Sequence, residues 1–181
     1  MYSTLSIAFR KAASRDIDAM AKLYADAFAD KNERTHLDNF LRWGVNERDM
    51  RVIIAETEDH KIAGFVMTEF NSSTMRNAVN VVDLAVSPEH QGQGVGRALL
   101  KQVEETALKN EFDTVTLQVR KGNTKAIGLY QSLGFGIMGE DKKYYRDGES
   151  ALEMKKYLNP LDPPKGLHLP RFFKRMLSIY A

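Results

Sequence analysis

Three glycines alternate with other residues in the segment Gln91-Gly92-Gln93-Gly94-Val95-Gly96-Arg97. The segment follows a run typical of a strand and precedes one typical of an amphipathic helix. Backbone N–H groups exposed at the start of a helix suit a phosphate or pyrophosphate. The alternative is a loop whose glycines only turn the chain. A Walker A loop is excluded because Gly-Lys-Ser/Thr is missing, and a dinucleotide fingerprint would need glycine where the chain has Arg97.

One acidic residue is unusual because of its neighbours. Asp83 lies in a run of valines and alanines that is predicted to be a strand. A carboxylate in such a place must be hydrogen-bonded or face a cavity, because burial of an unpaired charge is costly. Glu69, in the preceding predicted strand, has the plainer interpretation of a solvated strand end.

The composition excludes several other kinds of chemistry. The chain has 181 residues and no cysteine. Disulfides, thiolate zinc sites, Cys–His nucleophile pairs and a covalent thioester on the enzyme are therefore ruled out. The four histidines show no metal-ligand spacing, so we predict no metal site.

Charge and hydropathy limit the classes of partner that the protein is expected to bind and its expected location in the cell. The net charge is +2 at pH 7, with +3 on residues 158–181 and −1 on the rest. Because phosphate binding needs a broad basic surface, we predict no nucleic-acid partner. The chain has neither a signal-peptide pattern nor an apolar run of about 18 residues, so we expect a cytoplasmic protein without a membrane span.

The spacing of apolar residues predicts the elements that position these groups. Helices are expected over residues 16–28, 33–43, 94–110 and 124–133, and strands over 5–11, 51–57, 62–70, 77–86, 114–120, 137–146 and 149–156. Strict alternation would place Asp83 on the same sheet face as Val81 and Ala85. Asp147-Gly148 predicts a two-residue hairpin between the last two strands. The order β-α-α-β-β-β-α-β-α-β-β indicates a mixed α/β fold, antiparallel in its hairpins and parallel where helices intervene.

Two linked motifs resemble those of the GNAT superfamily of N-acetyltransferases. The run VDLAVSPEHQGQGVGR, residues 82–97, looks like that family's Gln/Arg-x-x-Gly-x-Gly/Ala motif. The run NTKAIGLYQSLGF, residues 123–135, is similar to its downstream motif. The order of elements also matches over residues 5–157. The resemblance implies a GNAT fold with a largely antiparallel mixed sheet, and acetyl-CoA as co-substrate.

The resemblance also implies a role for each residue of the cofactor site. The backbone of Leu84, Ala85 and Val86 would pair with the pantetheine arm, and the Val86 amide would lie near the thioester carbonyl. Asn123 would contact the pantetheine or phosphate arm. The backbone amides that would hold the pyrophosphate belong to Gln91, Gly92, Gln93, Gly94, Val95, Gly96 and Arg97.

The resemblance gives Tyr130 a catalytic role. From spacing alone this side chain would merely pack, since it shares a helix face with Ala126, Leu129 and Leu133. The family match places it near the sulfur instead. There a phenol, with a pKa of about 10, can act as general acid toward the departing thiolate.

The resemblance leaves the general base open. The segments LQVR, residues 117–120, and YYRDGESALEM, residues 144–154, look like the subgroup that acetylates a ribosomal-protein N-terminus, which usually carries Glu where this chain has Gln118. Because glutamine cannot accept a proton, either Glu69 or Asp83 serves through water or the amine arrives neutral. An α-amine of pKa about 8 is neutral far more often than a lysine of pKa about 10.4, which favours α-amines.

The leading prediction is an acetyl-CoA-dependent N-acetyltransferase that transfers acetyl directly to a protein or peptide N-terminal α-amine. A small-molecule amine, such as a polyamine, an aminoglycoside or an amino acid, is the nearest alternative acceptor. A non-catalytic acyl-CoA-binding module is the third. An acidic, closed acceptor pocket would favour a small amine, and an open groove would favour a peptide.

The chain divides at its C-terminal end. We predict a catalytic domain over residues 1–157, and a proline-rich linker with a short basic amphipathic tail over 158–181. The plain interpretation of the tail is a helix that packs on its own domain or on a neighbouring subunit, so a homodimer is one outcome. Membrane-surface attachment has weaker support from so few basic residues.

Overall fold

The computed structural model describes residues 6–28, 41–42, 44–45, 47, 49–73 and 76–159. Most of the helix predicted over 33–43 lies outside these residues, although Leu41 and Arg42 are helical. The predicted tail also lies outside them, apart from Leu158 and Asn159. The division of the chain at residue 158 therefore stays a prediction.

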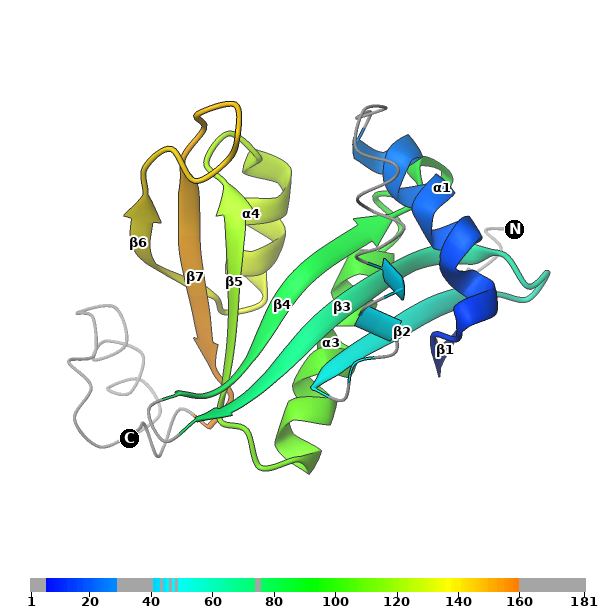
Figure 1. Ribbon diagram of the computed structural model, residues 1–181, viewed down its shortest axis with the longest axis horizontal. Helices are drawn as coiled ribbons and strands as arrows, with labels where there is room; N and C mark the ends of the chain where they lie inside the picture. The colour runs from blue at the N-terminus through cyan, green and yellow to red at the C-terminus, as the bar shows by residue number, and fades with distance from the viewer. Residues whose placement is uncertain are drawn as a thin grey trace.

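The centre of the molecule is a seven-stranded mixed sheet with the order β1-β2-β3-β4-β5-β7-β6 (Figure 1). The parallel pair is β4 with β5, and the other neighbouring strands are antiparallel. The strands are β1 (Ile7–Lys11), β2 (Met50–Thr57), β3 (Ile62–Ser73), β4 (Arg76–Val86), β5 (Thr114–Arg120), β6 (Gly136–Asp141) and β7 (Ala151–Tyr157). The predicted mixed α/β fold, its order of strands and its largely antiparallel sheet are confirmed.

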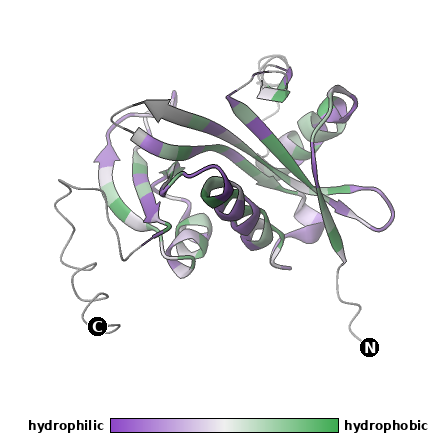
Figure 2. Ribbon diagram, turned by 90° about the horizontal axis from the view of Figure 1, so that it is seen from below, coloured by the Kyte–Doolittle hydropathy of each residue, from purple (hydrophilic) through white to green (hydrophobic). Residues whose placement is uncertain are grey.

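Helices cover both faces of this sheet. The described helices are η1 (Ser14–Asp16), α1 (Ile17–Phe28), η2 (Pro88–His90), α3 (Val95–Lys109) and α4 (Thr124–Ser132). Helix α1 buries Ile17, Met20 and Ala21 in a cluster with β2 and β3, as its apolar spacing predicts. Figure 2 shows hydrophobic residues, in green, along the strands of the sheet.

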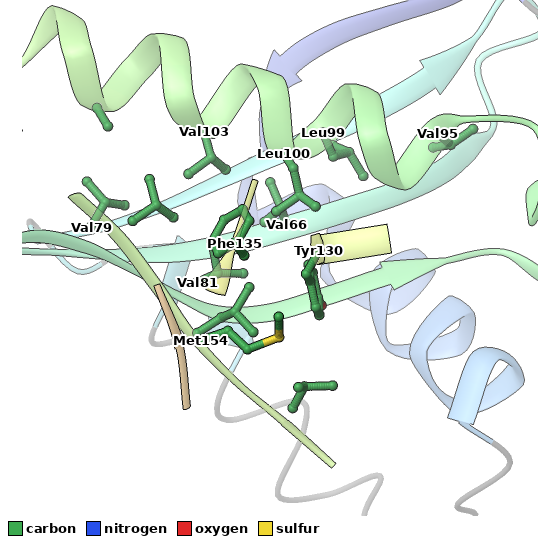
Figure 3. Close-up of a cluster of buried hydrophobic side chains, with 14 of the residues drawn as sticks. Val66, Val79, Val81, Val95, Leu99, Leu100, Val103, Tyr130, Phe135 and Met154 are labelled. Atoms are coloured by element: carbon green, nitrogen blue, oxygen red, sulfur yellow. The ribbon is translucent and has the colours of Figure 1, made fainter. Parts of the chain in front are cut away.

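A second apolar cluster lies between α3 and the other face of the sheet. Figure 3 shows side chains of α3 pointing toward valines of β3 and β4, with Tyr130, Phe135 and Met154 beside them. The buried residues of α3 recur at intervals of one to four and are Val95, Leu99, Leu100, Val103 and Ala107. This packing holds the N-terminus of α3 against the end of β4.

A bulge in β4 overturns the predicted face of Val81. Met67 of β3 pairs with Asp83 and Thr68 pairs with Val81, so Val82 is an extra residue on β4. Val81 therefore packs in the α3 cluster, while Asp83 keeps the face of Ala85, which packs in the α1 cluster. The predicted alternation was wrong here because a bulge shifts the two-residue period by one.

The predicted two-residue hairpin at Asp147-Gly148 was also wrong. Strands β6 and β7 do pair, but β6 ends at Asp141 and β7 begins at Ala151, with a loop over residues 142–150 between them. The loop contains its own turn, in which the Gly148 N–H donates to the Tyr145 carbonyl at 2.8 Å. Gly148 adopts a φ of 84°, so the Asp-Gly pair does turn the chain, but within a longer connection.

Strands β3 and β4 and helix α3 come into close contact at Gly64 of β3. A Cβ atom at Gly64 would lie 2.8 Å from the Ala85 carbonyl oxygen and 3.3 Å from side-chain atoms of Leu99 and Val95. We expect Gly64→Ala to lower the free energy of unfolding by about 1–3 kcal/mol, as overpacking does. Urea unfolding followed by circular dichroism measures the change.

Gly128 is the matched control for this substitution. It lies in α4, and a Cβ atom there would meet nothing within 4 Å. Gly128→Ala should leave stability unchanged or raise it by up to about 1 kcal/mol, because alanine favours a helix over glycine. Equal destabilisation by both substitutions would contradict the contact proposed for Gly64.

Candidate active site

The free edge of β4 forms one side of the candidate site. Strand β4 pairs with β5 only from Ala78 to Val81, opposite Thr114 to Leu117. After the bulge at Val82 the two strands diverge, as Figure 1 shows. Residues 82–86 therefore have no partner in β5, and their backbone groups on that side can bind a ligand.

The glycine loop lies at the end of this edge. Residues 91–94 form exposed turns, and α3 begins at Val95 with Gly94 at its N-cap. Gly92 and Gly94 have φ values of 75° and 86°, which other residues adopt at a cost. The first N–H groups of α3 have no partner within the helix, so this end attracts an anion.

Side chains of the glycine loop hydrogen-bond to nearby backbone carbonyl groups and hold the loop in position. The Gln91 side-chain nitrogen donates to the Val86 carbonyl at 3.2 Å, and the Gln93 side-chain nitrogen donates to the Glu89 carbonyl at 2.7 Å. Arg97 extends from the first turn of α3 and donates to the Ser132 hydroxyl at 2.7 Å. The structure thus joins the glycine loop to the end of β4 and to α4.

Asn123 begins α4, the helix that carries Tyr130. Its side-chain oxygen accepts from the Ala126 N–H at 3.1 Å and caps the helix. The oxygen has a second lone pair and the amide nitrogen has two N–H groups, so both can still contact a ligand. The structure gives Asn123 an architectural role that the sequence comparison did not predict.

Tyr130 lies in the last turn of α4, where its side chain is buried and the residue is 7% exposed. Its ring contacts that of Phe135, with 5.8 Å between centroids. Burial, with smaller contributions from Asp83 and Tyr145, raises the pKa of Tyr130 to about 12. The phenol is therefore protonated at neutral pH, and nothing in the described part of the chain hydrogen-bonds its hydroxyl.

Asp83 lies on β4 beside the bulge and is half-buried. Its Oδ1 accepts from the Leu84 N–H at 2.9 Å, and the Tyr24 side chain of α1 also hydrogen-bonds it. Loss of solvent around the carboxylate outweighs these hydrogen bonds and raises its pKa to about 7. A group with this pKa can take up a proton near neutrality.

Glu69 is the other carboxylate predicted as the base, and Gln118 stands where the similar subgroup usually carries glutamate. Glu69 pairs with Asn80, on the stretch of β4 that is still joined to β5. It does not contribute to the pKa of either Tyr130 or Asp83. Gln118 is exposed on β5 opposite Glu153. Of the two predicted carboxylates, the structure brings only Asp83 together with Tyr130.

A cluster around Arg120 positions the β6–β7 loop and was missed at the level of the sequence. The Arg120 guanidinium lies 2.7 Å from Asp147, 2.8 Å from Glu149 and 3.9 Å from the centroid of the Tyr145 ring. Glu149 also accepts from the Gly122 N–H at 2.8 Å. These contacts tie the loop to the turn that precedes α4. Adjacent tyrosines in the segment YYRDG were a signal, but the contact with Arg120 depends on strand pairing.

Across residues 6–28, 49–73 and 76–159 and the few described between 41 and 47, no three or more His, Asp or Glu side chains are grouped so as to hold a metal ion. In that part of the chain, no helix is long and apolar enough to cross a membrane.

Comparison with known proteins gives a family match. Residues 17–135 match the model of the acetyltransferase (GNAT) family. Among solved structures, yncA from Salmonella typhimurium, solved with its cofactor acetyl-CoA, has a TM-score of 0.71 at 25% identity over 90% of this chain and 99% of that one.

Two curated relatives act on different acceptors. The chain is 30% identical to the streptothricin acetyltransferase of Streptomyces lavendulae over 112 residues, which are 60% of this chain and 58% of that protein. It is 36% identical to the [ribosomal protein bS18]-alanine N-acetyltransferase of Escherichia coli K12 over 89 residues, which are 49% of this chain and 57% of that protein. In both cases the match spans less than two thirds of the relative.

Proposed function

Because the chain belongs to the acetyltransferase (GNAT) family, we propose that it is an acetyl-CoA-dependent N-acetyltransferase that acts on a primary amine. One observation carries the proposal beyond the family match. The free edge of β4, the Asp83 carboxylate and the Tyr130 phenol lie together beside a helix N-terminus suited to a pyrophosphate. A donor site and two groups that can exchange protons thus adjoin each other.

The β4 edge and the glycine loop supply the contacts that acetyl-CoA needs. The backbone of Leu84, Ala85 and Val86 would pair with the pantetheine arm, and the N–H groups of residues 91–97 would hold the pyrophosphate. Arg97 adds a cation at the same end of α3. A relative of similar fold, yncA, was solved with acetyl-CoA, which supports this choice of donor.

The proposed reaction is a direct transfer. The amine nitrogen bonds to the thioester carbonyl carbon, and the bond from that carbon to sulfur breaks. A backbone N–H of the β4 edge stabilises the negative charge on the carbonyl oxygen. Asp83 takes the proton that the amine loses, and Tyr130 donates a proton to the thiolate. The products are the N-acetylated amine and coenzyme A, and the absence of cysteine excludes an acetyl-cysteine intermediate.

Asp83 is the better candidate for the base than Glu69. Its pKa of about 7 leaves a useful fraction ionised at neutral pH, and its charge acts on Tyr130. In the leaving-group role, Tyr130 is protonated at neutral pH because burial raises its pKa to about 12, so it carries a proton that it can donate to the thiolate. Asp83 thereby fills the role that Gln118 cannot perform.

We propose a protein or peptide N-terminal α-amine as the acceptor. The similarity to the bS18-alanine N-acetyltransferase supports this choice. So does the charge of the loop over residues 142–150, where Asp147 and Glu149 are both paired with Arg120. Polycationic amines are best recognised by unpaired carboxylates, and both of these carboxylates lie in ion pairs with Arg120.

A small-molecule amine is the second candidate acceptor, because the chain also matches streptothricin acetyltransferase. The cytoplasmic location, the lack of a nucleic-acid partner and the homodimer considered from the sequence stay predictions. They do not affect the proposed chemistry.

A thiol-release assay with acetyl-CoA tests the function and ranks the acceptors. The panel contains peptides with free and with blocked N-termini, polyamines, aminoglycosides and amino acids. We expect turnover with free N-terminal peptides and none with the blocked ones. Binding of acetyl-CoA without turnover on any amine would favour the non-catalytic module instead.

Gln118→Glu, assayed on the same panel, tests the assignment of the base. If Asp83 already accepts the proton, restoring a glutamate at position 118 should raise turnover little. A large gain would show that the missing glutamate limits the wild-type enzyme and would contradict Asp83 as the base.

A further inference from the structure

The Asp83 carboxylate accepts a hydrogen bond from a backbone N–H group on the free edge of β4. The Ser87 N–H donates to the Ala63 carbonyl of β3, so the N–H groups of Leu84 and Val86 point to the opposite side, away from β3. This is the side that β5 no longer covers. There the Asp83 carboxylate accepts the Leu84 N–H at 2.9 Å. One of the two edge donors is thus engaged by a side chain of the same strand.

We propose that Asp83 couples the two halves of the reaction: its carboxylate holds the Leu84 N–H in the free enzyme and releases it when the acetyl donor pairs with the β4 edge. This inference rests on the proposed function, because it assumes that acetyl-CoA binds along that edge. On this proposal, the Asp83 carboxylate is hydrogen-bonded to Leu84 before acetyl-CoA binds, and binding of acetyl-CoA frees it.

The groups around Asp83 set the direction of the effect. Tyr24 faces it from α1, Tyr130 from α4 and Tyr145 from the loop over residues 142–150, and Met67 of β3 is its strand partner. The hydrogen bonds from Leu84 and Tyr24 are the interactions that lower its pKa. Release of the Leu84 N–H removes the first-named of these, so the pKa of Asp83 rises in the complex.

This rise has a consequence for acetyl-CoA affinity. Below the pKa of the free enzyme, Asp83 is protonated with or without the ligand, and binding carries no penalty from ionisation. Between about pH 7 and the higher pKa of the complex, Asp83 is ionised in the free enzyme but protonated in the complex, so binding requires uptake of a proton. Affinity should therefore fall with rising pH and level off above both values. The fall is about tenfold for each unit by which release raises the pKa.

Calorimetric titration of the full chain with acetyl-CoA, without acceptor, between pH 6 and pH 9 tests the inference. Asp83→Asn keeps an oxygen that can accept the Leu84 N–H but has no titrating group. Because pH dependence from the phosphates of acetyl-CoA persists in this variant, the difference between the two curves reports Asp83. We expect the wild-type affinity to fall more steeply with pH than that of the variant.

Asp83→Ala removes the hydrogen bond itself, and it should bind acetyl-CoA more tightly than the wild type at pH 8. Parallel pH curves for the wild type and Asp83→Asn would overturn the coupling while leaving the proposed donor site supported. Should Asp83→Ala be unstable, that pair of curves still decides the question. If the wild-type protein binds no acetyl-CoA at any pH, the proposed function itself fails.

Discussion

Replacement of Tyr130 by phenylalanine is expected to lower kcat by about 10²–10⁴-fold, the usual contribution of a general acid. The substitution removes a hydroxyl but keeps the ring that contacts Phe135 at 5.8 Å. Acetyl-CoA affinity, measured by calorimetry, should be nearly unchanged, because the backbone of β4 and the glycine loop supply the proposed donor contacts. Steady-state thiol release gives kcat.

The pH dependence of turnover adds a second test of Tyr130. Since burial raises its pKa to about 12, this phenol stays protonated between pH 6 and pH 9. The loss of turnover in Tyr130→Phe should therefore be the same across that range. Tyr157→Phe is the matched control, because Tyr157 is also buried but pairs with Thr114 at the opposite end of β5 from Arg120. Wild-type turnover in Tyr130→Phe would remove the general acid from the mechanism.

Replacement of Asp83 by asparagine is the second large effect that we expect. Loss of the base should lower kcat/KM for the acceptor by about 10²–10⁴-fold. In the wild-type enzyme saturated with acetyl-CoA, kcat/KM for the acceptor should rise with pH as the Asp83 carboxyl ionises, and this limb should be absent in Asp83→Asn. The comparison uses one acceptor throughout, so that ionisation of the amine contributes equally to both profiles.

Glu69→Gln is the matched substitution, because it makes the same change from carboxyl to amide on the neighbouring strand. Its effect should be smaller, since Glu69 pairs with Asn80 rather than with a residue of the free edge. A greater loss in Glu69→Gln than in Asp83→Asn would move the base to Glu69.

Stability separates a catalytic defect in Asp83→Asn from a folding defect. The pKa of Asp83 is raised on folding, from 3.8 to about 7, so the folded state holds its proton more tightly than the unfolded state. The ionised carboxylate therefore reduces stability as pH rises from about 4 to 7, and the penalty is fully present above that range. Asp83→Asn should thus be at least as stable as the wild type at pH 8, although it is less active.

The order of the helices and strands could be predicted from the sequence because it depends on local spacing. The apolar residues of α1 and α3 recur with the helical period, and the structure buries them. The glycine loop could be predicted for the same reason, because it also depends on residues close together in the sequence. Gly92 and Gly94 were placed between a strand and a helix, and both adopt the positive φ values for which glycine is suited.

The β4 bulge and the choice between Asp83 and Glu69 were decided by the tertiary structure. Each carboxylate lies in a strand, and nothing near it in the sequence says which residue of the next strand it will face. Pairing of Met67 with Asp83 and of Glu69 with Asn80 fixes that choice, and the extra residue Val82 opens the edge beside Asp83.

The same reason explains the loop over residues 142–150. The Asp-Gly pair predicted a tight hairpin, but Arg120 of β5 pairs with Asp147 and Glu149 and holds a longer connection. The sequence by itself determined the family, the elements and the glycine loop, since these depend on residues close together in the chain. Strand register and the contacts of Arg120 join residues far apart in the chain, so only the folded sheet could decide them.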